Sequence, residues 1–393
     1  MRVMQRALAL LAGLVACSSA AAPPATVASP PPPPPPPPRV EPRDPAVARV
    51  DDVVETIAGK QVHDPYRWME SGGAEYDAYL AAQDQKARAA LRAIPNRDKL
   101  RDLIHAVNRG VTRVTVIAVT GPAKAPRIFL FKREPDDEVA QLYMRDGWSG
   151  ADKLLVDPRT RDAAGVHHAL DNVAPAPDGK HVAYGIAAAG SEDSTIEILD
   201  IDRNTVLPER IDRAQYAQID WRDARSFFYW RRKKPSATDT KADWFKYSAT
   251  YLHVLGEDPE QAQALFGPAI AELGIPVESF SGIDASAASN WVLAYASPGT
   301  SADSEYFVAP KASVVPGAKI PWRRITGPHD QVNWVFAHGD TLYAYTYANA
   351  PNYRIVAFDA KAGTLATAKV VLPEEALFVS VTCQLVFVEI GSL

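Results

Sequence analysis

The chain has 393 residues, of which 47% are hydrophobic and 23% are charged, values that are typical of globular proteins. A formal net charge of −5 argues against a nucleic-acid-binding surface, which needs a clustered positive footprint. The two cysteines, Cys17 and Cys383, are too few for a disulfide framework. The length allows several ordinary domains or one large repeat domain.

The N-terminus has the pattern of an export signal. Arg2 and Arg6 precede an apolar run from Ala7 to Ala16, which is too short to span a bilayer. The run leads into Leu14-Val15-Ala16-Cys17, which resembles the lipobox of bacterial lipoproteins, where the cysteine is acylated. We therefore predict a lipoprotein-type signal peptide over residues 1–16 and lipidation at Cys17. Ordinary cleavage at Ala20-Ala21-Ala22 is the alternative.

An unbroken run of prolines extends from Pro30 to Pro38. Proline fixes φ and lacks the backbone donor, so this run must adopt polyproline II, a stiff spacer with a rise of about 3.1 Å per residue. We predict that residues 17–49 form a Pro-rich, disordered tether from a lipid anchor. The lipobox resemblance implies export to the bacterial cell envelope, as an outer-membrane lipoprotein or a periplasmic protein.

Residues 50–110 are predicted to form a helical prologue. Asp64-Pro65-Tyr66 indicates a turn, because proline disfavours helix at the residue before it. Apolar and helix-favouring residues then predict one helix over Glu75–Ala93. A second helix is expected after Asn96, with Gly110 as its stop and an apolar stripe of Leu100, Leu103, Ile104 and Val107.

From Val111 onward, short β-branched and aromatic runs alternate with turn residues. No long helical pattern separates them, so the predicted sheets are antiparallel. The turn at Asp178-Gly179 and the one at Asp223-Ala224 each precede a strand, about 45 residues apart. Such a period is typical of propeller blades. The predicted blades span 111–157, 168–208, 214–268, 277–326 and 329–373, and a sixth begins near Leu377.

The fold class predicted from these patterns is all-β. It is an incomplete β-propeller of about five to six four-stranded blades over residues 111–393, preceded by a short α-helical segment. Within it, the basic run Arg231-Arg232-Lys233-Lys234 is interpreted as a solvated loop edge, and Cys383 as a buried apolar residue.

Several segments resemble the prolyl oligopeptidase family of serine peptidases. Asp64, Pro65, Tyr66, Arg67 and Trp68, with Met69-Glu70, match the opening signature of the family. Weaker matches occur at 175–180, 191–196, 251–256 and 351–355. The resemblance implies a β-propeller that covers an α/β-hydrolase domain, and an activity that hydrolyses short peptides after proline.

No catalytic residue, cofactor site or metal site is predicted. A serine nucleophile of this fold sits in a G-x-S-x-G-like elbow, and the nearest string, Gly147-Trp148-Ser149-Gly150, has the wrong spacing and indicates a turn. His167-His168 is interpreted as a loop pair, since neighbours on a strand point to opposite faces. Residues 136–138 (Asp-Asp-Glu) are interpreted as a solvated turn, because they lack the pattern of a calcium loop.

Three functional hypotheses remain open. The chain is the propeller portion of a prolyl-oligopeptidase-like enzyme, truncated before its catalytic domain and inactive alone. Alternatively, it is an envelope-anchored propeller that serves as a binding module. In the third hypothesis it is one half of a split peptidase. The expected partners are a peptide substrate or a separate hydrolase domain, together with a membrane through the lipid anchor, and no nucleic acid.

Overall fold

The computed structural model of the protein describes residues 44–375 except 136, 287, 300 and 302. The predicted signal peptide, Cys17, the proline run, the start of the sixth blade and Cys383 lie outside these residues. The chain divides into two compact units, Met1–Arg97 and Asp98–Leu393. The division falls at the start of the second helix, whereas the sequence placed the end of the prologue at residue 110.

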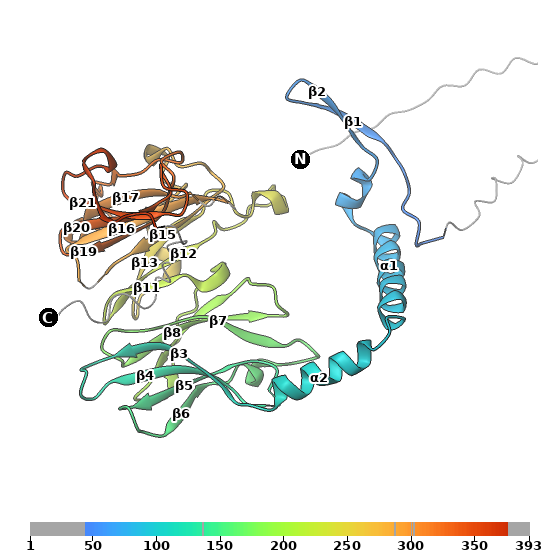
Figure 1. The fold of residues 1–393 in the computed structure, drawn as a ribbon, viewed down its shortest axis with the longest axis horizontal. Coiled ribbons are helices and arrows are strands. Elements are labelled where there is room, and N and C mark those ends of the chain that lie inside the picture. Colours follow the sequence, from blue (N-terminus) through green and yellow to red (C-terminus); the bar gives the residue numbers. More distant parts are fainter. Residues whose placement is uncertain (1–43, 136, 287, 300, 302, 376–393) are drawn as a thin grey trace, which may run out of the picture. The chain divides into compact units, whose positions relative to one another are not determined.

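The first unit contains a hairpin as well as a helix (Figure 1). Strands β1 (Val53–Ile57) and β2 (Lys60–Asp64) pair antiparallel and are followed by a short 3₁₀ helix, η1 (Arg67–Ser71), and helix α1 (Ala74–Arg92). The prediction of a purely helical prologue missed the hairpin. Its two-residue turn, Ala58-Gly59, has positive φ at both positions, and alanine there is a weak turn signal.

Both predicted helices are confirmed, α1 within one residue at either end. Helix α2 (Arg97–Arg109) begins directly after Asn96, and Gly110 follows its last residue. The predicted apolar stripe of α2 is exposed in the structure: Leu100 58%, Leu103 61%, Ile104 49% and Val107 65%. The α2 stripe, defined by these four residues, is therefore an apolar helix face open to solvent.

Five four-stranded antiparallel sheets make up the rest of the described chain, each with its strands in chain order, as predicted (Figure 1). Blade 1 comprises β3 (Arg113–Thr120), β4 (Arg127–Arg133), β5 (Gln141–Asp146) and β6 (Asp152–Val156); blade 2 comprises β7 (His168–Pro175), β8 (His181–Ala188), β9 (Thr195–Asp200) and β10 (Thr205–Val206). Blade 3 comprises β11 (Ile219–Asp223), β12 (Ser226–Arg231), β13 (Ala249–Val254) and β14 (Ala264–Phe266).

Blade 4 comprises β15 (Ser279–Asp284), β16 (Trp291–Pro298), β17 (Glu305–Pro310) and β18 (Arg323–Arg324); blade 5 comprises β19 (Val332–His338), β20 (Thr341–Thr346), β21 (Arg354–Asp359) and β22 (Lys369–Leu372). Short 3₁₀ helices occur in loops within and between the blades: η2 (Pro158–Arg161), η3 (Gln215–Ala217), η4 (Lys241–Asp243), η5 (Pro259–Gln261), η6 (Ala271–Leu273), η7 (Lys311–Ser313) and η8 (Leu365–Thr367).

The order of strands fixes which loops share a side of the propeller. The first strands of neighbouring blades contact each other, β3 with β7 and β7 with β11, so the first strand of each blade is the inner one. With antiparallel strands in chain order, loops between second and third strands lie on the same side as the connections between blades. We call this side the connection face. The opposite side, formed by the loops after first and third strands, is the turn face.

The core lies between blades. One cluster joins blades 1 and 2 through Phe129 and Tyr184, and another joins blades 2 and 3 through Ile196 and Phe227. Further clusters join blade 3 to blade 4 and blade 4 to blade 5. Each sheet thus buries apolar side chains against the neighbouring sheet, which is the packing that the 45-residue period predicts.

Truncating Phe266 tests this packing. Phe266 is fully buried between blades 3 and 4, with its ring 5.1 Å from Phe307 and 5.2 Å from Trp322. We expect Phe266→Ala to lower the free energy of unfolding by about 3–5 kcal/mol, through lost burial and a residual cavity. Urea unfolding followed by tryptophan fluorescence measures this loss. Val371→Ala, at a position that is 56% exposed, is the control and should change stability little.

Candidate functional site

The residues of the sequence signature hold the first unit together. Asp64 accepts hydrogen bonds from the Tyr66 backbone N at 3.1 Å and from Arg67 Nε at 2.6 Å. Arg67 also binds both carboxylate oxygens of Glu55 across the β1–β2 hairpin, at 3.1 and 2.7 Å. The Arg67 hydrogen bond lowers the pKa of Asp64. Proline at 65 provides the turn that brings these groups together.

Trp68 completes this arrangement. Its indole Nε1 donates to the Arg49 carbonyl at 2.7 Å, and the Arg49 guanidinium lies 4.9 Å from the centre of the indole ring. All of these interactions join the hairpin, η1 and the segment before β1. The signature therefore has a structural role in the described residues, as a junction between a hairpin and a helix.

Backbone strain in the propeller unit is concentrated on the connection face. Apart from Asn204, all described residues of this unit that have positive φ and are not glycine lie on the connection face. They are Ala164, Ala189, Glu192, Arg213, Tyr216, Ala217, Tyr247, Gln331, Asn349 and Tyr353. The turn face uses glycine at most such positions, for example Gly121, Gly179 and Gly339. A side chain at positive φ costs on the order of 1 kcal/mol or more, and such strain gathers at functional surfaces.

The longest loop of the connection face, residues 232–248 between β12 and β13, is fixed by a buried arginine. Arg232 donates to Asp193 Oδ1 of blade 2 at 2.6 Å. Its guanidinium also lies over two rings of its own loop, 5.6 Å from Trp244 and 5.4 Å from Phe245. Arg232 therefore fastens the loop to its own blade and to the neighbouring blade.

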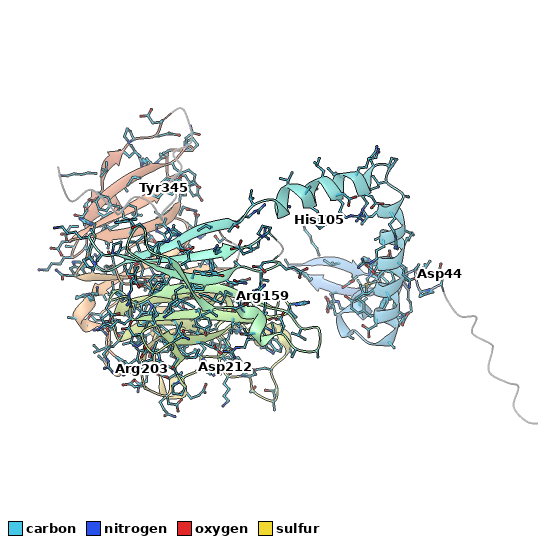
Figure 2. All side chains as sticks on the ribbon, turned by 90° about the horizontal axis from the view of Figure 1, so that it is seen from below. Asp44, His105, Arg159, Arg203, Asp212 and Tyr345 are labelled. Carbon is cyan, nitrogen blue, oxygen red and sulfur yellow. The ribbon has the colours of Figure 1, made fainter. Side chains whose placement is uncertain are left out.

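The interpretation of the basic run as a solvated edge was wrong for its first two members. Arg231 and Arg232 are only 5% and 7% exposed. Arg231 pairs with Asp212 and Glu260, and Arg213 joins the same cluster through Glu260 at 2.6 Å (Figure 2 labels Asp212). The acidic partners, Asp212 and Glu260, come from distant parts of the chain, so the run itself held no signal of this burial.

Exposed aromatic side chains from successive loops accompany the strain. Tyr216 is 43% exposed, Trp244 39% and Tyr247 50%. Their loops are joined by backbone hydrogen bonds, from Tyr216 N to Glu192 O at 3.1 Å and from Tyr247 N to Val277 O at 2.8 Å. The connection face thus presents large amphipathic rings on a firmly held backbone, which is the composition of a surface that contacts a partner.

A pocket of about 230 Å³ lies on the propeller axis, since inner strands of four blades line it. They contribute Asn172 from β7, Asp220 from β11, Asp284 from β15 and Trp334 from β19. Tyr295 lines the pocket from behind β15. Its ring approaches the inner strand so closely that a Cβ at position 282 would lie 2.4 Å from Tyr295 Cζ, which explains the glycine there.

Two acidic side chains of this pocket are perturbed. Burial raises the pKa of Asp220 to about 7, with a further contribution from the charge of Asp284. Burial likewise raises the pKa of Asp284. Burial and the same two carboxyl groups raise the pKa of Tyr295 to about 12. The sequence analysis missed this pair, because its members are 64 residues apart and lie on different blades.

Three histidines of the described chain lie beside carboxylates. His63 Nδ1 lies 2.6 Å from Asp52, and His167 and His168 both bind Asp162, at 3.0 and 3.3 Å. His167 precedes β7 and His168 is its first residue, so the predicted pair lies where loop meets strand. Asp137 of the predicted acidic turn pairs with Arg159, which is labelled in Figure 2.

The string Gly147-Trp148-Ser149-Gly150 lies between β5 and β6, in the turn that the sequence predicted. Within residues 44–375, apart from the few that are not described, no group of His, Cys, Asp and Glu side chains is placed to hold a metal ion. None of the helices in the described part of the chain combines the length and apolar character that a membrane crossing requires.

Comparison with known proteins identifies relatives of this fold. Residues 45–387 match the family described as prolyl oligopeptidase, N-terminal β-propeller domain. The prolyl endopeptidase of Elizabethkingia meningoseptica is 26% identical over 313 residues, which are 77% of this chain and 41% of that protein. Prolyl oligopeptidase A of Galerina marginata is 25% identical over 343 residues, 77% of this chain and 43% of that one.

Solved structures agree in fold. A structure from a mechanistic study of two prolyl endopeptidases superposes with a TM-score of 0.68 and 25% identity, over 84% of this chain and 46% of that chain. Prolyl oligopeptidase B from Galerina marginata, bound to a 35mer hydrolysis and macrocyclization substrate, gives a TM-score of 0.68 at 20% identity. The chain therefore spans less than half the length of these relatives, over their propeller.

The substitution Arg232→Lys tests whether Arg232 holds the 232–248 loop in place; we call these contacts of Arg232 the clamp. Lysine keeps the charge but loses the planar group that lies over Trp244 and Phe245. We expect chymotrypsin to cleave the variant within 232–248 about tenfold faster than the parent protein, because local opening becomes easier. Cleavage sites are read by mass spectrometry. Lys234→Arg, at an exposed position of the same loop, is the control, and equal rates for all three proteins would refute the clamp.

Proposed function

The chain belongs to the prolyl oligopeptidase family, whose N-terminal β-propeller domain it matches over residues 45–387, and we propose that it serves as the propeller of a serine endopeptidase. That enzyme would hydrolyse short peptides after proline. The propeller would cover a catalytic α/β-hydrolase domain that lies outside the matched region. The family match and the shared fold support this proposal.

The observation that carries the proposal is the uneven distribution of backbone strain. The connection face holds Glu192, Tyr216 and Tyr247 at positive φ, although a glycine would be easier to accommodate at each position. A surface that only faced water would gain nothing from such strain. We assign the connection face as the side turned toward the catalytic domain, with Tyr216, Trp244 and Tyr247 as its contact residues.

A second docking element is the α2 stripe. Leu100, Leu103, Ile104 and Val107 are spaced to form one face of a helix, and each is about half exposed or more. A contiguous apolar face of this kind on a soluble domain marks an interaction site. In the proposed enzyme this helix face packs against the hydrolase domain.

The described residues are not expected to hydrolyse peptides by themselves. A serine peptidase needs a hydroxyl bonded to an imidazole that a carboxylate orients. The rings of His63, His167 and His168 do have carboxylate partners, but no serine hydroxyl is bonded to these three rings. The proposed role is therefore to cover and restrict access to a catalytic site on another segment or another polypeptide, as in a split enzyme.

The axial pocket supports a second candidate, a binding module. Its carboxyl and amide side chains (Asp220, Asp284, Asn172) beside Trp334 suit a small polar ligand with basic groups. Under this alternative, a proline-containing basic peptide would bind the purified chain without a partner and would not be hydrolysed. Isothermal titration with such a peptide distinguishes the two candidates.

The proposed function is tested with a chromogenic Gly-Pro substrate. We expect no turnover above the buffer blank for the purified 393-residue chain, and turnover when it is co-expressed with a separate hydrolase domain of the same family. In that complex, Tyr247→Ala should lower kcat/KM about tenfold, because the loss of one aromatic contact is worth on the order of 1.4 kcal/mol.

The matched control is Trp148→Ala, since Trp148 is 65% exposed but belongs to the turn face. This variant should leave kcat/KM unchanged. Turnover by the isolated chain would show that the catalytic assignment is mistaken. Equal losses for the two variants would instead refute the choice of the connection face.

We also propose, on the lipobox alone, that Cys17 anchors the protein in the bacterial envelope. Cys17→Ser removes the thiol that lipidation needs. We expect the variant to lose incorporation of labelled palmitate and to shift from the membrane to the periplasmic fraction. Ser18→Ala is the control and should retain both. If the parent protein incorporated no labelled palmitate, the proposed lipidation at Cys17 would be contradicted. Cleavage at Ala20-Ala21-Ala22 would then be favoured.

A further inference from the structure

Two carboxyl groups from neighbouring blades meet at the axial pocket. Asp220 lies on β11 of blade 3 and Asp284 is the last residue of β15 of blade 4, and both residues line the axial pocket. An ionised carboxylate has no hydrogen to donate. A hydrogen bond between two carboxyl groups therefore exists only while the pair holds at least one proton.

The pair spans the seam between the two blades. Asp220 Oδ2 accepts a hydrogen bond from the backbone N of Ala285, in blade 4, at 3.1 Å. Both carboxyl groups are half-buried, because the inner strands of the ring enclose them. Loss of the shared proton would place two negative charges side by side in this seam.

Few charged groups could compensate for that repulsion. Lys311, on η7, is the cation that faces the pair, and its Nζ already donates to the Ser286 carbonyl at 3.1 Å. The phenols of Tyr295 on β16 and Tyr306 on β17 are the other titratable groups that face it. Burial keeps both phenols neutral to high pH. Lys311 alone cannot neutralise two carboxylates.

The remaining contacts across the seam do not respond to pH near neutrality. Its centre is apolar, with Phe228 and Phe266 of blade 3 packed with Ile283 and Phe307 of blade 4. Hydroxyl groups add hydrogen bonds, between Thr250 and Ser281 at 3.1 Å and from Ser248 Oγ to the Ser279 carbonyl at 3.3 Å. Neither kind of contact gains or loses a proton in this range.

We propose that Asp220 and Asp284 form a proton-dependent latch between blades 3 and 4. The latch is closed while the pair shares a proton, and loss of that proton loosens the seam and opens the axial pocket beside it.

The pH range follows from the raised pKa of Asp220, about 7, and from the raised pKa of Asp284. In the unfolded chain both groups titrate near pH 4. Between roughly pH 4 and pH 7 the folded state holds a proton that the unfolded chain has released. The free energy of unfolding therefore falls as the pH rises through this range, and the dependence ends above the folded pKa.

Asp220→Asn tests the latch directly. An amide at position 220 can accept the Ala285 N–H through its oxygen and donate to the Asp284 carboxylate through its nitrogen, so it imitates the pair with one proton. The melting temperatures of both proteins are compared at pH 5.5 and pH 8.5. We expect the decrease between these two pH values to be larger in the parent protein than in the variant, by about 4 °C or more. Asp146→Asn, at a side chain that is 70% exposed, is the control and should follow the parent.

Hydrogen exchange gives the local measurement. After correction for intrinsic exchange, protection of the Ala285 amide should fall about tenfold between pH 6 and pH 8.5 in the parent protein and stay constant in Asp220→Asn. The proposal would be overturned if the melting temperatures of parent and variant changed equally with pH. It would also be overturned if the protection of the Ala285 amide in the parent did not change with pH. If Asp220→Asn does not fold, the exchange of the parent protein decides alone. Neither measurement depends on peptidase activity.

Discussion

In this protein each four-stranded sheet buries apolar side chains by packing them against a neighbouring blade. The clusters that pair Phe129 with Tyr184, and Phe266 with Phe307, are the result of this constraint. It explains why the blades repeat at a nearly constant period and why the connections run from an outer strand to the next inner strand. The positions of the loops on the two faces follow from the same arrangement.

Polar groups fasten the seams that the apolar clusters fill. Arg127 reaches Asp202 between blades 1 and 2, Arg232 reaches Asp193 between blades 2 and 3, and Trp291 reaches Asp340 between blades 4 and 5. These links stay formed across neutral pH, because guanidinium and indole groups do not titrate there. The seam between blades 3 and 4 differs, since a carboxyl pair contributes to it. The proposed latch therefore lies in the seam between blades 3 and 4.

The two faces of the propeller serve different purposes, although the same hairpin rules build them. The turn face satisfies most of its positive-φ positions with glycine, and its loops connect strands at low cost. The connection face holds tyrosine, glutamate and arginine in the same region of φ, and the buried Arg232 holds its longest loop. Rigid, strained loops that expose aromatic rings suit contact with a second domain.

The sequence by itself determined the secondary-structure elements and turns that follow from local periodicity. The blades, the antiparallel order, the turn at Asp178-Gly179 and the helices α1 and α2 follow from spacing and turn chemistry, and the structure confirms each of them. Only the tertiary structure decided the burial of Arg231 and Arg232, the side of the propeller on which strain gathers, and the meeting of Asp220 with Asp284. These features join residues from different blades, and a pairing between distant residues leaves no periodic trace in either segment.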